Sequence, residues 1–508
     1  EIPHGAVLHE EDHDEDHGDE HGDEHMGYLE NTDYLSEATK FGVSKTGDWG
    51  YFGISVDNIE SIYGIPFHGD EHGDEDHGDE HGDEDHDDEE GHDEHEGERI
   101  FSTTDSESLT LKGSYNVNGA LVNKVDYTFR SSDYSLTEAH AEEHDDEDHG
   151  DEHGDEDHGD EHEEHAPTVF LNDSKEYGAI FDVSKDDLSR KISFNFVDED
   201  TSIFGEEAFM NPANSREITL GYFMSKEFDA YSVDFGLRLD QIGRTGSVSH
   251  EDGDNENFNI EDTTSSFALN IGRNLNDNLE MTLGFASVER LPSVIELFMN
   301  GPHLATGRFE VGDPNLKSET SNNFDITFNY EKDNYYAYAS FFINDVDNYI
   351  ALMDEDEDHH DDHDDDHGDD DHGDDDHGDD DHGHGNLIHA NYMQENAEFD
   401  GYEIEIGRTV ELGSGELTLS YGRDVVNAQF SDGHNVPRIN PARNIYSLSY
   451  KQNDLIFKLH LKDVEKQNDF GEGESATEGY QMLDSRLTKT FSPGGKTVLK
   501  VSIFGNNL

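Results

Sequence analysis

The chain has 508 residues and a formal net charge of −93, with 124 acidic residues against 31 Lys and Arg. A surface this acidic repels a phosphate backbone, which excludes an ordinary nucleic-acid-binding protein. The chain has no cysteine, which excludes thiolate metal sites, disulfides and cysteine nucleophiles, and it has no run of about 18 apolar residues that could form a membrane helix.

The negative charge is concentrated in four repeat segments of the His-Gly-Asp-Glu and His-Gly-Asp-Asp-Asp types. They hold 63 of the 124 acidic residues, 27 of the 33 histidines and no Lys or Arg. The repeats cover residues 9–25, 68–98, 138–165 and 354–384. Because they repel themselves and have little to bury, we expect disordered loops. Including flanking residues, the expected disordered loops are 4–27, 68–98, 138–165 and 354–389.

The rest of the chain predicts β-strands, because apolar and polar residues alternate. Clear examples, in chain order, are residues 231–240, 279–286, 455–462 and 499–503. A period of two gives each strand one apolar and one polar face, as half-buried antiparallel strands require. About 18 such strands are expected.

The lengths of the connections between these strands indicate the architecture. Short turns are expected near 46–50, 117–119, 185–188, 226–229, 274–278, 332–334, 413–415, 452–454 and 492–495. Long connections are expected near 59–106, 132–175, 199–215, 240–264, 289–322, 345–398, 424–443 and 464–478. The two kinds alternate strictly, so all long loops and all four His-rich segments fall at one end of a meander.

This alternation predicts an all-β fold, a transmembrane antiparallel β-barrel with long extracellular His/Asp/Glu-rich loops. The 29 Phe and 21 Tyr beside one Trp suit the aromatic girdles of such a barrel. A large soluble all-β domain is the alternative that the pattern leaves open.

Several motifs resemble the barrel of TonB-dependent outer-membrane receptors. They are Arg-Leu-Pro-Ser-Val-Ile-Glu-Leu (290–297), Gly-Asp-Pro-Asn-Leu (312–316) with Glu319, Gly-Tyr-Glu (401–403), Val-Pro-Arg-Ile-Asn-Pro (436–441) and Phe-Gly-Asn-Asn-Leu (504–508). The resemblance implies a location in the outer membrane of a Gram-negative bacterium and no enzymatic activity. It also implies a monomer that works with the TonB complex, a divalent metal ion and outer-membrane lipid, without nucleic acid.

Within that family the chain is most similar to the zinc-type receptors. The similar segments are Ser-Ile-Tyr-Gly-Ile-Pro (61–66), Gly-Glu-Glu-Ala-Phe (205–209) before Pro212, and Gly-Pro-His-Leu-Ala-Thr (301–306). The family barrel has 22 strands and follows a plug domain. We therefore expect residues 1–508 to be a partial barrel domain, without the plug, the first three strands and the last strand, and with open edges.

The His-rich segments provide neutral imidazoles beside carboxylates, a ligand set suited to zinc and also to nickel, copper or cobalt. Their spacing places another imidazole every four or five residues. The predicted loop ligands are His13, His17, His21, His72, His77, His81, His149, His153, His158, His367, His372 and His377. Because simple solvation by acidic tracts does not require histidine, we interpret the loops as metal-capturing segments. Binding should weaken below about pH 6.5, where imidazole is protonated.

A transport site needs more order than these loops, and three residues outside the repeats are candidates. In zinc-type receptors, segments matching those of Glu206, Glu207 and His303 contribute ligands above the plug. The resemblance implies that the remaining ligands come from the plug. The alternatives that stay open are loop solvation or a lumen ion pair for the two glutamates, and a His303 that is packed or solvated without metal.

Three functional hypotheses follow. The first is TonB-coupled uptake of zinc or a similar divalent ion. The second is uptake of an iron chelate or another metal complex, and the third is a surface protein that binds metal without transport. An enzyme is not expected, because zinc-protease and serine-hydrolase motifs are absent from the sequence.

Overall fold

The computed structural model of the chain describes residues 31–65, 99–141, 167–205, 208–249, 255–303, 306–355, 387–494 and 497–507. These residues form twenty strands of one sheet and one short helix. The elements are β1 (Tyr34–Gly47), β2 (Gly50–Gly64), β3 (Arg99–Asn116), β4 (Lys124–Ala141), β5 (Thr168–Asp182), β6 (Leu188–Phe204), β7 (Ala213–Glu227), β8 (Tyr231–Ser249), β9 (Asn255–Asn276), β10 (Leu279–Arg290), α1 (Val294–Phe298), β11 (Asn300–His303), β12 (Arg308–Val311), β13 (Glu319–Lys332), β14 (Tyr335–Asp354), β15 (Ile388–Leu412), β16 (Gly415–Phe430), β17 (Arg443–Gln452), β18 (Leu455–Val464), β19 (Tyr480–Gly494) and β20 (Thr497–Gly505).

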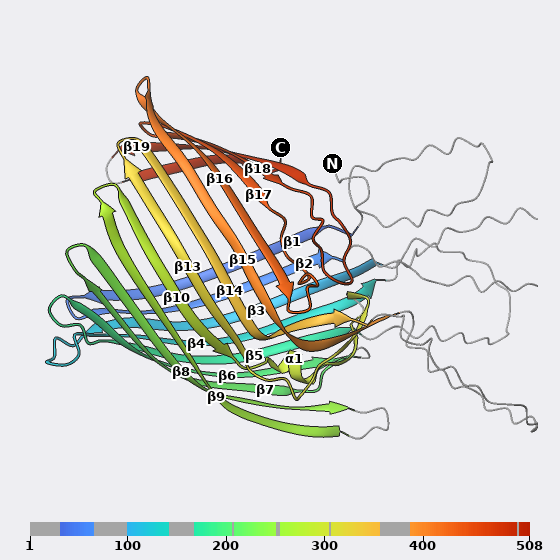
Figure 1. Cartoon of the computed structure of the whole chain (residues 1–508). Helices are drawn as coiled ribbons and strands as arrows, with labels where there is room; N and C mark the ends of the chain where they lie inside the picture. The colour runs from blue at the N-terminus through green and yellow to red at the C-terminus, as the bar shows by residue number, and fades with distance from the viewer. Residues whose placement is uncertain are drawn as a thin grey trace, which may run out of the picture.

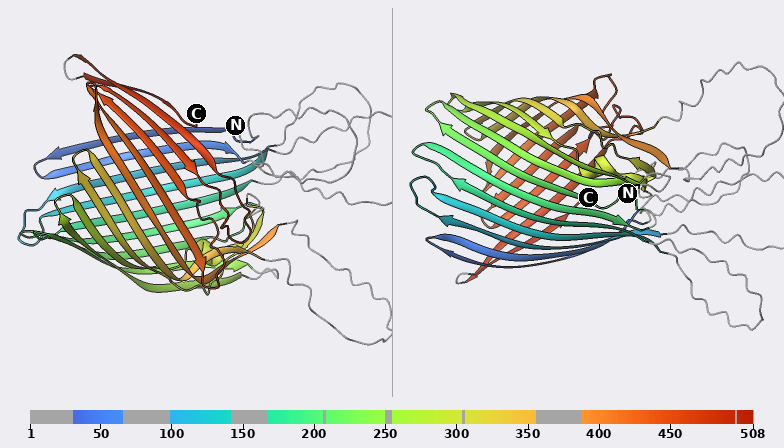
Figure 2. Two further views of the ribbon diagram at one scale, coloured as in Figure 1. Left: turned by 45° about the horizontal axis from the view of Figure 1, so that its top comes forward. Right: turned by 90° about the horizontal axis from the view of Figure 1, so that it is seen from below.

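The sheet is an antiparallel meander that curls into a barrel wall (Figures 1 and 2). Strands adjacent in the chain pair with each other, and β10 pairs with both β9 and β13. The exceptions are β11 and β12, which form a hairpin inside the β10–β13 connection, where β12 pairs in parallel with β15. Eighteen strands therefore build the described wall, as the alternation predicts.

The two faces of the wall differ in chemistry, because side chains alternate along each strand. On the outer face, Phe129, Tyr177 and Phe196 follow one another across β4, β5 and β6, with ring centroids 4.9 and 6.0 Å apart. On the lumen face, the Nδ2 of Asn172 donates to Oε1 of Glu199 over 2.8 Å. This division is typical of a barrel whose apolar side contacts lipid and whose lumen is polar.

All nine predicted short turns join strands at the same end of the sheet. In four of these turns an Asn or Asp adopts the left-handed conformation, at Asn118, Asp186, Asp333 and Asn453, with φ between 48° and 55°. Short polar side chains tolerate that conformation better than other residues do. These Asn and Asp residues are therefore a sign of the turns that can be read from the sequence.

The strands at the other end run further than predicted. The connection expected over 240–264 is mostly strand, because β8 and β9 pair up to Ser249 and Asn255. Beyond the bilayer neither face needs to be apolar, so the alternation stops while the hydrogen-bonded ladder continues. For the same reason β4 and β15 extend a few residues into the segments 138–165 and 354–389. Residues 142–165 and 356–386 of those segments lie outside the described residues, as do 4–27 and 68–98.

The sheet has two free edges among the described strands. There β1 pairs only with β2, and β20 pairs only with β19. No helix in the described part of the chain is long and apolar enough to cross a membrane.

Candidate functional site

The long β10–β13 connection folds into the lumen at the long-loop end and carries α1. Ser293 and Glu296 form a capping box: the Ser293 Oγ accepts from the Glu296 amide, and Glu296 Oε2 accepts from the Ser293 amide over 2.7 Å. Such a box fixes the first turn of a helix. The Arg290 guanidinium bridges Glu296 and Glu319, 2.8 and 3.1 Å away, and so ties α1 to the wall.

The helix is held on the lumen face by burial. Leu297 and Phe298 are almost fully buried, and Phe298 packs against Gly246 of β8. A Cβ at Gly246 would lie 2.4 Å from the Phe298 ring, so this approach requires glycine. The cluster around the helix also contains Phe209 and Met299. The β10–β13 connection, residues 291–318, thus packs as a layer across the long-loop opening of the barrel. We call this layer the shelf, and the opening the mouth of the barrel.

His303 lies at the end of β11, in this shelf. Its Nδ1 lies 3.0 Å from Oε1 of Glu310 on β12, and the same oxygen accepts from Thr306 Oγ1 over 2.9 Å. The imidazole packs against Phe209, with ring centroids 4.7 Å apart, and more loosely against Phe170. The ring is therefore fixed by one hydrogen bond and by aromatic contacts.

Glu310 is only 4% exposed. Burial opposes its ionisation, but hydrogen bonds from His303 and Thr306, with the charges of His303 and Arg308, outweigh burial and lower the pKa of Glu310. The carboxylate therefore remains negative and oriented at neutral pH. It is a suitable partner for an imidazole that binds a cation through its other nitrogen.

The hairpin that carries these residues is anchored to β14 and β15. Arg308 binds both carboxylate oxygens of Asp354, over 2.7 and 2.9 Å. On the other face of β12, Phe309 stacks on His389, with centroids 5.1 Å apart. The residues of the hairpin are thus held by contacts that connect distant parts of the chain.

A lumen cavity of about 500 Å³ lies between this shelf and the wall strands β3 to β6. Arg130, Asn172 and Thr201 line it from the wall, and Met299 and His303 line it from the shelf. Its lining is mostly apolar, with a few polar groups, as in many ligand pockets.

The structure brings His303 together with Glu310, which sequence reasoning missed. The other predicted ligands of the ordered site, Glu206 and Glu207, lie outside the described residues, as do all twelve predicted loop ligands. Among the described residues, no group of three or more His, Cys, Asp and Glu side chains is placed to hold a metal ion. His303 and Glu310 are then one imidazole and its supporting carboxylate, rather than a complete metal shell.

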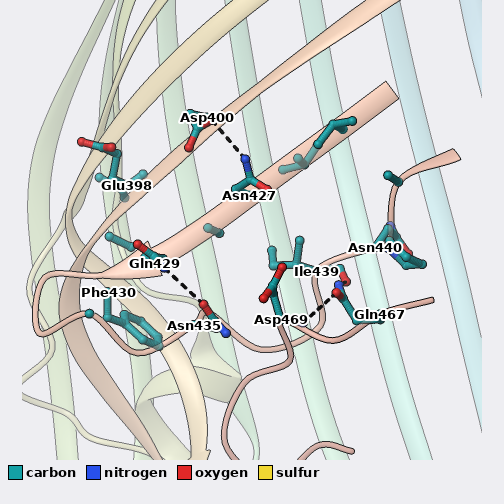
Figure 3. Close-up of a pocket in the computed structure, with 18 of the residues that line it drawn as sticks. Glu398, Asp400, Asn427, Gln429, Phe430, Asn435, Ile439, Asn440, Gln467 and Asp469 are labelled. Atoms are coloured by element: carbon teal, nitrogen blue, oxygen red, sulfur yellow. Dashed lines mark hydrogen bonds between the residues drawn. The ribbon is translucent and has the colours of Figure 1, made fainter. Parts of the chain in front are cut away.

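A second cavity, of about 1140 Å³, lies at the long-loop end of β15 and β16 (Figure 3). Asn427 and Asp400 point toward each other there, with a 3.2 Å hydrogen bond. By strand alternation both belong to the outer face, which they share with Ile406 and Leu419. The cavity has no histidine in its lining. It is therefore a weaker candidate for a lumen transport site.

Comparison with known proteins identifies the family. Residues 27–508 match the family described as TonB dependent receptor-like, beta-barrel. The chain belongs to the TonB-dependent receptors. This membership places the receptor in the outer membrane of a Gram-negative bacterium, in a family of transport receptors rather than enzymes.

The solved structures that are similar to this TonB-dependent receptor have low sequence identity to it, but the similarity covers most of the chain. The copper transporter OprC is 13% identical, with a TM-score of 0.66 over 94% of this chain and 66% of its own. The FrpB iron transporter from Neisseria meningitidis (F3-3 variant) is 11% identical, with a TM-score of 0.58 over 91% and 66%. The hemophore receptor HasR of Serratia marcescens, in complex with HasA and heme, is 10% identical, with a TM-score of 0.59 over 91% and 67%. At these identities the likeness shows the fold, and the chain spans about two thirds of their length.

Proposed function

We propose that this receptor imports a metal ion or a metal complex across the outer membrane, with energy supplied by the TonB complex. Family membership supports the coupling, since TonB-dependent receptors are transporters. The similar structures include a copper transporter, an iron transporter and a hemophore receptor in complex with its hemophore and heme. These similarities support a metal-containing cargo without selecting one.

The cargo that we propose is zinc or a similar divalent ion, and the pairing of His303 with Glu310 carries this proposal. Because the carboxylate engages Nδ1, the Nε2 of His303 is the ring nitrogen left to bind a metal. A carboxylate that orients a metal-binding imidazole is a common arrangement around zinc. Glu206 or Glu207, and groups outside this chain, are the proposed remaining ligands.

The His-rich loops are proposed to concentrate the ion before it reaches His303. Their sequence combines 27 histidines with 63 acidic residues. Acidic clusters focus cations and raise their local concentration, and many weak sites favour rebinding. The ion then passes to the ordered site in the mouth of the barrel.

Uptake of a metal complex is the second candidate, and the lumen cavity favours it. About 500 Å³ is far more space than a bare ion needs, and Phe170, Phe209 and Met299 give part of the lining an apolar character. Such a lining suits an organic chelator. A receptor for a complex should keep its uptake when the His-rich loops are removed, whereas a free-ion receptor should not.

The test is accumulation of radiolabelled zinc in metal-starved cells that express the receptor, with and without a proton uncoupler. We expect uptake to stop with the uncoupler, in His303→Ala, and in a variant that lacks the four His-rich inserts. His460→Ala is the matched control, because His460 also faces the lumen but its Nδ1 bonds the Ser447 hydroxyl over 3.1 Å.

Three results would contradict parts of the proposal. Zinc that stays on the surface and ignores the uncoupler would indicate a metal-binding surface protein without transport. Energy-dependent zinc uptake that is unchanged in His303→Ala would contradict the proposed ordered site at His303. Energised uptake of a zinc or iron chelate, but not of the free ion, would select the second candidate.

A further inference from the structure

The charges on the outer face of the wall are sorted along its height. Near the short turns, the outer face carries the cations Lys45, Lys226, Arg273, Lys332, Arg408 and Lys489, as strand alternation from the apolar rows shows. No carboxylate of a described strand lies on that face within five residues of a short turn. The sorting is notable because the chain has 124 acidic residues and only 31 Lys and Arg.

The opposite end of the outer face is acidic. Asp198, Glu289, Asp345 and Asp400 lie on it toward the long loops. Short turns of outer-membrane barrels lie on the periplasmic side, so the cations lie at the level of the inner-leaflet headgroups. Figure 1 shows this end of the sheet opposite the end that carries α1. Headgroup phosphates are the anions available at that level.

Two of these cations flank one aromatic ring. Lys332 pairs with Tyr335 across β13 and β14, and Tyr335 pairs with Arg408 across β14 and β15, so the three side chains form one row. The Arg408 guanidinium lies 4.6 Å from the centre of the Tyr335 ring. Neither Lys332 nor Arg408 forms an ion pair with a described carboxylate, and both are exposed. Their charges are therefore available to a ligand.

An apolar groove continues from this row toward the centre of the bilayer. The space is about 600 Å³ and is lined by Tyr330, Ile406, Leu419 and Tyr421 beside Arg408. Ile406 is 56% and Leu419 47% exposed on the lipid face. A cationic row at headgroup level, joined to an apolar groove, matches a molecule with an anionic head and an acyl tail.

We propose that Lys332, Tyr335 and Arg408 bind the phosphate of an inner-leaflet glycerophospholipid, with one acyl chain in the groove beside Ile406 and Leu419. Adjacent strands are about 4.8 Å apart, so the two cations approach a phosphodiester from both sides of the Tyr335 ring. The guanidinium donates two N–H groups to phosphate oxygens, and the ammonium adds a point charge. This site is independent of the metal cargo.

The test is binding of phosphatidylglycerol to the delipidated full receptor in detergent, measured by native mass spectrometry. Each cation near a membrane surface contributes about fivefold in affinity for anionic lipid. The double variant Lys332→Gln/Arg408→Gln should therefore bind the lipid about 25-fold more weakly. Tyr335→Leu, which keeps the apolar volume, should weaken binding less.

The matched control is Lys112→Gln/Lys458→Gln, which removes two exposed cations from the lumen face. It should bind phosphatidylglycerol as the wild type does, and far-UV circular dichroism should show the same β-sheet content in all variants. Unchanged binding in the outer-face double variant would overturn the proposal. An equal loss of phosphatidylglycerol binding in the control variant would also overturn it. So would binding of diacylglycerol, which lacks phosphate, as tightly as phosphatidylglycerol, or displacement of the lipid by inorganic phosphate.

Discussion

Removal of the Glu310 carboxylate measures how much the orientation of His303 matters for metal binding. Glu310→Ala deletes the oxygen that lies 3.0 Å from His303 Nδ1 and 2.9 Å from Thr306 Oγ1. Loss of a carboxylate that orients a metal-binding imidazole typically weakens metal affinity by about 10- to 100-fold, or about 1.4 to 2.7 kcal/mol. We expect an effect in this range, because Glu310 is buried and solvent does not readily replace it.

The effect of Glu310 on zinc affinity has two parts, its negative charge and its hydrogen bond to the imidazole, and a second variant separates them. Glu310→Gln keeps an acceptor oxygen but removes the negative charge, so its affinity should lie between those of the wild type and Glu310→Ala. Thr306→Val is the matched control, because it removes the other donor to the same oxygen and leaves the His303 contact in place. It should keep zinc affinity within about twofold of the wild type, since the Thr306 hydroxyl contacts the carboxylate and the backbone carbonyl of His303 but not the imidazole.

The assay is zinc competition against a fluorescent chelator, with purified receptor whose His-rich inserts have been shortened. Shortening is needed because 27 loop histidines would otherwise dominate the signal. Wild-type affinity in Glu310→Ala, together with lost affinity in His303→Ala, would refute the orienting role of the carboxylate. Wild-type affinity in both variants would refute the whole site.

Three further predictions concern the stability of the barrel mouth. Gly246→Ala places a methyl group into the Phe298 ring, so it should destabilise the packed shelf by about 1–3 kcal/mol and speed proteolysis of residues 291–318. Arg308→Gln breaks the bidentate ion pair that anchors the β11–β12 hairpin, so hydrogen exchange of the β12 amides should increase while exchange in β5 stays unchanged. Hydrogen bonds from Arg423 hold the pKa of Glu465 below its ordinary value of 4.5. The stability of the wild type relative to Glu465→Gln should therefore be full at neutral pH and disappear as pH falls below 4.5 through the lowered pKa, with thermal melts showing a difference below about 1 kcal/mol.

The wall of the barrel could be predicted from the sequence because each strand has its own alternating pattern of apolar and polar residues. Alternation between bilayer-level positions fixes which residues face lipid, and residues such as Asp333 and Asn453 mark the turns. This alternation ends where the strands leave the bilayer. From that level on, pairing such as Ser249 with Asn255 depends on hydrogen bonds that leave no hydrophobic pattern.

The candidate site was only half predictable. His303 was found through family resemblance, whereas Glu310 depends on a hairpin that brings residues seven apart into contact. A local sign of that hairpin exists in Gly307, whose φ of 63° suits a tight turn. His303 contacts Phe170 of β5 and Phe209 of the β6–β7 connection, and contacts between such distant parts of the chain arise only in the folded barrel.

The charge of the chain also bears on the choice between the two proposed cargos. A negative charge of 93 attracts cations and repels an anionic chelate before it reaches the mouth of the barrel. Among the described residues that line the lumen cavity, Arg130 is the one permanent cation, and an acidic chelate would depend on it to offset that repulsion. A free divalent ion, or a neutral or cationic complex, meets no such barrier and finds a negative Glu310 behind His303. Electrostatics therefore favours the cation over the anionic complex, even though the cavity is large enough for both.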